Sequence, residues 1–77
     1  MAKYIIKNNL PTEHLEHVQN FGSKAEAKKS FLFTFQVFSA LHPCKVFLRD
    51  EKGMNLRGTI QVEINGFFYY VELFKEL

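Results

Sequence analysis

Apolar and polar residues alternate along the C-terminal half of the chain, and this alternation predicts antiparallel strands. Residues 45–49, 56–64 and 67–73 each repeat with a period of two, which places apolar side chains on one face of a sheet. Asn65-Gly66 stands between the last two runs and is typical of a two-residue type I′ hairpin turn. The pattern therefore predicts a three-stranded meander with one apolar face.

The turn also predicts the register of this meander, because a two-residue loop fixes which residues pair. Paired residues on the inner face are Ile64 with Phe67, Val62 with Tyr69, Ile60 with Val71 and Gly58 with Leu73. For the preceding hairpin we expect Glu51-Lys52-Gly53 to form a three-residue loop. That loop would place Phe47 opposite Arg57.

The central segment fits either a helix or a strand. Ser23 and Glu26 match a capping box, followed by good helix formers, and an apolar stripe then recurs at helical spacing. As a strand, residues 31–38 would alternate between two faces. The capping box favours the helix, which His42-Pro43 ends. The residues of the stripe are Ala27, Phe31, Phe35, Phe38 and Leu41.

The N-terminal segment completes the expected fold. Residues 3–7 predict a short strand, and Thr12 to Asn20 predicts a short helix with Leu15, Val18 and Phe21 on one side. We expect one α+β domain over residues 1–77, with a three- to four-stranded, mainly antiparallel sheet packed on one Phe-rich helix. The order is β-α-α-β-β-β, or β-α-β-β-β if the short helix is only a turn.

Composition narrows the class of protein. The chain has 77 residues and a single cysteine, Cys44, so an internal disulfide is impossible and a reducing, cytoplasmic setting is expected. No signal peptide or membrane-spanning run stands out. The net charge of +2 is too small to indicate nucleic acid by itself.

The residues that could carry chemistry are few and scattered. His14 and His17 stand three apart on the expected short helix, and His42 with Cys44 could complete a metal site, but an exposed polar face explains them better. Cys44 has no orienting partner that would make it a nucleophile. We therefore expect no enzyme, no bound metal and no cofactor.

The outer face of the predicted sheet mixes aromatic and basic side chains. Such a face could stack single-stranded RNA or DNA, could stabilise the hairpins through a cation–π row of Phe47, Arg57 and Phe74, or could be covered by protein. The protein that covers the face could be the first strand, a second protomer or a partner. Of the three interpretations, a face covered by protein is favoured. The face carries Lys45, Phe47, Arg49, Arg57, Gln61, Phe68, Tyr70 and Phe74.

A second candidate surface is the far side of the Phe-rich helix, where Phe33, Val37 and Ala40 point away from the stripe. Our hypothesis is a non-enzymatic protein-binding module, an inhibitor or adaptor of the phage or mobile-element type, with a homodimer as one version. The alternative is an RNA- or single-stranded-DNA-binding module. The expected partner-binding residues are Phe33, Val37, Phe47, Arg49, Arg57, Phe68, Tyr70 and Phe74.

Overall fold

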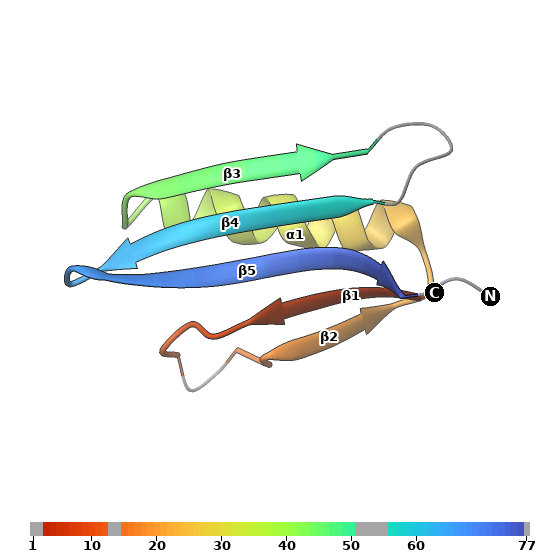
Figure 1. Ribbon diagram of the computed structural model, residues 1–77, viewed down its shortest axis with the longest axis horizontal. Helices are drawn as coiled ribbons and strands as arrows, with labels where there is room; N and C mark the ends of the chain where they lie inside the picture. The colour runs from red at the N-terminus through yellow and green to blue at the C-terminus, as the bar shows by residue number, and fades with distance from the viewer. Residues whose placement is uncertain (1–2, 13–14, 51–55, 77) are drawn as a thin grey trace.

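The computed structural model describes residues 3–12, 15–50 and 56–76 and consists of one sheet with one helix on its inner face (Figure 1). All strand pairs are antiparallel, and the spatial order of the strands is β2-β1-β5-β4-β3. The elements in chain order are β1 (Lys3–Asn8), β2 (Val18–Phe21), α1 (Lys24–Ser39), β3 (Cys44–Arg49), β4 (Arg57–Ile64) and β5 (Phe67–Glu76).

The β4–β5 hairpin confirms the predicted turn and register. Asn65 and Gly66 both have positive φ, 52° and 82°, as a type I′ turn requires. Every inner-face pair has the predicted partner, from Ile64 opposite Phe67 to Gly58 opposite Leu73. A strongly local signal, a dipeptide that tolerates positive φ between two alternating runs, was enough to determine this part of the fold.

The β3–β4 register differs from the prediction. Phe47 lies opposite Thr59, and Arg57 lies opposite Arg49, so the connection runs from Asp50 to Leu56. The proposed Glu51-Lys52-Gly53 loop lies outside the described residues. Leu56, the residue before β4, is fully buried and belongs to the core.

Helix α1 confirms the helical interpretation of residues 31–38. Ser23 is its N-cap and accepts a hydrogen bond from the Glu26 amide at 3.4 Å. The carbonyl of Phe38 accepts from the amides of both Leu41 and His42, which closes the last turn before Pro43. Leu41 was wrongly placed in the buried stripe: it follows the helix end and is 77% exposed.

Residues 18–21 form strand β2, so the predicted helix from Thr12 to Asn20 is wrong. β2 pairs with β1, and the Asn8 amide donates to the His17 carbonyl at 2.9 Å. A helix this short is marginal in isolation. As a strand, residues 18–21 satisfy their backbone hydrogen-bonding groups by pairing with β1. The sheet consequently has five strands instead of three or four.

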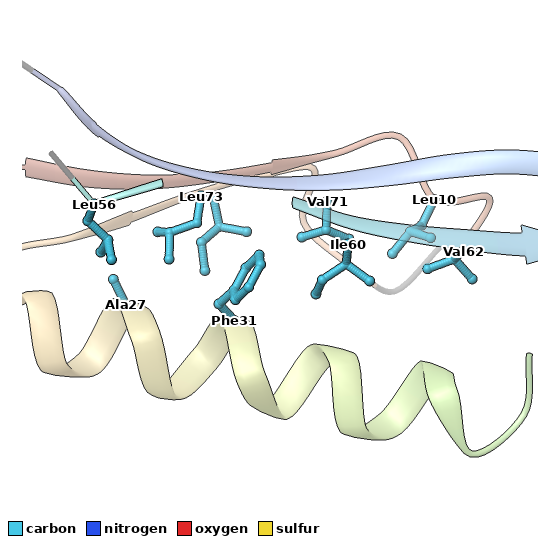
Figure 2. Packing of buried hydrophobic residues seen from close by; sticks show 9 residues of the cluster. Leu10, Ala27, Phe31, Leu56, Ile60, Val62, Val71 and Leu73 are labelled. Carbon is cyan, nitrogen blue, oxygen red and sulfur yellow. The ribbon is translucent and has the colours of Figure 1, made fainter. Parts of the chain in front are cut away.

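The core lies between the sheet and one side of α1, and Phe31 stands at its centre (Figure 2). Phe31 and Ala27 are fully buried, while Phe35 and Phe38 are half-buried beside them. A Cβ at Gly58 would come within 2.7 Å of the Phe31 ring, so this glycine leaves the space that the ring occupies. The other core residues are Ile6, Leu10, Leu56, Ile60, Val62, Val71 and Leu73.

The start of α1 is tied to the end of β3 by charge. Lys24 and Lys28 each place an ammonium group against the Asp50 carboxylate, at 2.5 and 2.6 Å. Hydrogen bonds from Lys24 and then Lys28 lower the pKa of Asp50, and the bond to Asp50 raises the pKa of Lys24. With only 16 residues, α1 does not meet the length needed to cross a membrane, and no other helix occurs in the described ranges.

Candidate protein-interaction surfaces

The outer face of the sheet, which is turned toward the viewer in Figure 1, has α1 behind it. The observed registers bring all eight of the expected outer-face residues to this side, from β3, β4 and β5. β1 does not lie across this face: it continues the sheet beside β5 and partly covers only Phe74. The expectation that the first strand could cover this face is therefore wrong, and among the described residues the face is open.

Three aromatic side chains stand out from this open face. Phe47 is 61% exposed, Phe68 51% and Tyr70 43%. Phe68 and Tyr70 follow one another on the same side of β5, the central strand, while Phe47 lies on the edge strand β3. Together with the basic residues around them, these rings form the surface that we call the outer aromatic face.

Phe74 differs from the other three aromatic residues because β1 partly covers it. It is half-buried opposite Ile5, which is itself buried, and Lys7 lies over its ring with Nζ 5.7 Å from the centroid. The expected row of Phe47, Arg57 and Phe74 does not form, since Phe47 pairs with Thr59. The observed cation–π contact uses Lys7, a residue that sequence reasoning could not place beside β5.

Charges on the outer face are mixed. Lys45, Arg49 and Arg57 lie on β3 and β4, whereas Glu63 and Glu72 lie on β4 and β5. Glu72 pairs with Lys7 on one side and Thr59 on the other. Positive charge therefore lies on β3 and β4 and, through Lys7, on β1, and the glutamates between them interrupt any continuous track along the aromatic rings.

Tyr70 is fixed in place by its backbone. Its amide donates to the Asn9 side-chain oxygen at 2.8 Å, and its carbonyl accepts from the Asn9 amide at 3.3 Å. These bonds attach the segment after β1 to the middle of β5. An exposed aromatic residue whose backbone is already held loses little backbone freedom on binding, which suits an interface anchor.

The far side of α1 is the second surface. Phe33 is 64% exposed, and Leu32 and Val37 are each 43% exposed. A shallow hollow beside them is lined by Glu26, Lys29, Ser30, Leu32, Phe33 and Gln36. The period of the helix predicted Phe33 and Val37; Leu32 was missed because its position between the two sides of the helix made it ambiguous.

The end of the molecule that holds the β4–β5 turn and the end of α1 carries further exposed apolar residues, which the sequence reasoning did not select (Figure 1). Leu41 follows the helix, and Phe67, the first residue of β5, is 67% exposed. Both had been assigned to the inner face or the buried stripe. The helix ends before it can cover this end of the sheet.

The histidines and the cysteine that were considered as metal ligands or as a nucleophile make other contacts. His17 donates from Nε2 to the Leu10 carbonyl at 3.1 Å, and the His42 ring stacks on Phe38. Burial raises the pKa of the Cys44 thiol, which keeps it protonated and poorly nucleophilic. His14 lies outside the described residues, and within the described ones no three His, Cys, Asp or Glu side chains form a group that could hold a metal ion.

No protein family model matches the sequence, and no curated protein matches it significantly. The functional argument therefore depends on the surfaces themselves.

Proposed function

We propose that the protein is a small, non-enzymatic protein-binding module, which acts as an inhibitor or adaptor on a larger protein. The observation that carries the proposal is the exposure of large apolar side chains on both sides of a two-layer fold. Among the described residues, ten large apolar side chains are more than 40% exposed, including Phe33 on the helix side and Phe47 and Phe68 on the outer aromatic face. Apolar surface of this extent is typical of binding sites, where aromatic residues often act as anchors.

The chemistry of the chain supports the same proposal. The Cys44 thiol has a raised pKa, and the His17 and His42 rings are occupied by a backbone carbonyl and an aromatic ring. A nucleophile would need a lowered pKa and a neighbouring base within hydrogen-bonding distance. A binding role needs neither of these features and uses the apolar side chains that remain exposed.

Photo-crosslinking in cells of the source organism tests the proposal. A benzophenone amino acid replaces Phe33 on the helix side or Phe68 on the outer aromatic face, and Glu16, an exposed residue next to β2, is the control position. We expect one defined crosslinked protein band from Phe33 or Phe68 and none from Glu16. If all three positions gave the same diffuse products, the proposal would fail.

Charge-reversal variants identify the surface in use. For the helix side the probe is moved to Val37, and Phe33→Asp should abolish its crosslink if that side binds. Tyr70→Asp should abolish the crosslink at Phe68 if the outer aromatic face binds. Circular dichroism should show a folded chain in both variants, because both side chains are already exposed. A crosslink to a second copy of this chain would support the homodimeric version.

A second candidate function is binding of single-stranded nucleic acid. It is favoured by the open outer aromatic face, where Phe68 and Tyr70 offer rings for stacking and Lys45, Arg49 and Arg57 lie nearby. Affinity for a labelled oligonucleotide would fall steeply with salt, because counterions are released on binding. It would also be lost in Tyr70→Ala and weakened in Arg57→Ala, whereas protein binding through the helix side would not depend on Arg57.

A further inference from the structure

The edge strand β3 offers a row of open backbone groups. Glu63, on β4, donates its amide to the Pro43 carbonyl at 3.0 Å, and these two residues extend the β3–β4 register by one pair beyond Cys44 opposite Val62. Hydrogen-bonded pairs alternate along an antiparallel ladder, so Lys45, Phe47 and Arg49 also bond toward β4. The amides and carbonyls of Cys44, Val46 and Leu48 consequently point away from β4, and in the described part of the chain no strand lies beyond β3 (Figure 1).

Side chains on both faces of β3 add apolar surface to this edge. Val46 is 42% exposed on the inner face, and its neighbour Phe47 is 61% exposed on the outer face. An open, apolar edge of this length is the kind of template on which an extended peptide can add a strand. Main-chain hydrogen bonds would then hold the peptide, and its alternate side chains would lie beside Val46 or beside Phe47.

Charge at the β3 edge selects among possible occupants. Lys45 and Arg49 lie on its outer side, with Arg57 opposite Arg49 on the neighbouring strand. A second copy of β3 paired antiparallel about Phe47 would place its Arg49 opposite Lys45, and like charges on neighbouring strands destabilise a pair. An incoming strand with carboxylates on that side would instead complement them.

The opposite edge of the sheet provides a contrast. The Asn8 amide bonds to the His17 carbonyl, so in β2 it is Val18 and Asn20 whose backbone groups point outward. Val18 is about as exposed as Val46, but the strand has four residues and no lysine or arginine. Length and charge thus distinguish two edges that otherwise resemble each other.

From these observations we infer that β3 binds an extended segment of a partner protein in which apolar and acidic residues alternate. The segment pairs antiparallel or parallel with β3, places an acidic side chain beside Lys45, and places its apolar side chains beside Val46. This inference rests on the proposed protein-binding function and specifies the chemistry of the partner.

The test uses the whole protein and a capped, fluorescent peptide in which Glu and Val alternate over about seven residues, a typical strand length. A matched peptide has Lys in place of Glu. We expect fluorescence anisotropy to show at least fivefold tighter binding of the Glu peptide, with NMR shift changes at the amides of Cys44, Val46 and Leu48. Equal binding of both peptides, or no binding of either, would overturn the inference.

Two variants and a control locate the site. Val46→Pro removes an outward amide that β4 does not use, so it should abolish peptide binding, whereas Val18→Pro makes the same change at the β2 edge and should leave binding intact. Lys45→Glu keeps the backbone and should reduce the preference for the Glu peptide, which provides a test even if Val46→Pro does not fold. Unchanged binding and preference in Val46→Pro and Lys45→Glu would contradict the assignment to β3.

Sedimentation of the protein alone tests whether a second copy of the chain occupies the β3 edge instead of a partner protein. A dimer that dissociates in Val46→Pro would mean that a second copy occupies the edge, which would overturn the acidic-partner inference. The photo-crosslinking experiment remains independent, because its probes at Phe33 and Phe68 lie on α1 and β5. The β3 inference can therefore fail while the protein-binding proposal stands.

Discussion

Two phenylalanines on α1, only two positions apart, have opposite environments. Phe31 is completely buried against the sheet, whereas Phe33 has 64% of its surface exposed on the far side of the helix. The residue type and the local helix are the same, so the difference comes from the period of the helix, which turns side chains two apart to nearly opposite sides. One side of α1 stabilises the fold, and the other is available for binding.

The same contrast extends to what surrounds each ring. Phe31 fills the space above Gly58, with its ring atoms at 2.7 and 2.9 Å from where a Cβ would lie. Phe33 lines a shallow hollow with Lys29 and Gln36. If the two sides have the separate roles proposed here, variants on the sheet side should affect stability and variants on the far side should affect binding.

The largest effect is expected for Phe31→Ala. Removing a fully buried aromatic ring loses its burial and leaves a cavity, at a cost of about 3–5 kcal/mol in the free energy of unfolding. Phe35→Ala should cost less, because Phe35 is only half-buried. Urea unfolding followed by circular dichroism measures both. A Phe35→Ala variant less stable than Phe31→Ala would show that the core is centred elsewhere.

A smaller effect is expected for Gly58→Ala. The added methyl group would press on the Phe31 ring and on Leu48, and overpacking of this kind costs about 1–3 kcal/mol. Alanine also restricts the unfolded chain, which offsets a part of that cost. The double variant Phe31→Leu/Gly58→Ala should be more stable than the sum of the two single changes predicts. Additive effects would contradict direct contact between the two positions.

The sequence was sufficient for the elements whose signals are local. Asn65-Gly66 determined the last hairpin, and Ser23 with Glu26 marked the start of α1. Strand β2 and the position of β1 beside β5 depend on pairing between distant segments, which no local pattern near Val18 records. The missing strand also explains the error in the number of strands.

The candidate surfaces could be predicted to a similar degree. The exposure of Phe33, Phe47 and Tyr70 follows from periods of 3.6 and 2 in the chain. Phe74 was less predictable, since it is partly covered by Ile5 and Lys7 from β1. The open backbone edge of β3 required the full strand order, because only that order shows which strand has no neighbour.

A third prediction concerns pH and the ion pairs at the start of α1. Lys24 and Lys28 lower the pKa of Asp50, so their contribution to stability is complete above the pKa of an unfolded aspartate and is lost as the pH falls through the lowered value. At alkaline pH, the contribution from Lys24 is lost as the pH rises through its raised pKa. Asp50→Asn should reduce both dependences, as measured by thermal unfolding between acidic and alkaline buffers. An unchanged acid profile in Asp50→Asn would contradict the assignment.

The smallest change in stability is expected for Phe33→Ala, the same substitution as at Phe31 but on the far side of α1. Most of the Phe33 ring is already in water, and alanine favours the helix more than phenylalanine does, so the free energy of unfolding should change by no more than about 0.5 kcal/mol. Urea unfolding under the conditions used for Phe31→Ala measures it directly.

Binding provides the other half of this comparison. If the helix side is the interface, Phe33→Ala should weaken association with the partner by tenfold or more, since truncating an anchor residue costs about 2 kcal/mol or more. The crosslink at Val37 should then disappear while the unfolding curve is unchanged. A large loss of stability in Phe33→Ala would mean that this ring supports the fold after all. Full stability together with full binding would indicate that the interface is the outer aromatic face or the β3 edge. Tyr70→Asp and Val46→Pro distinguish these two surfaces.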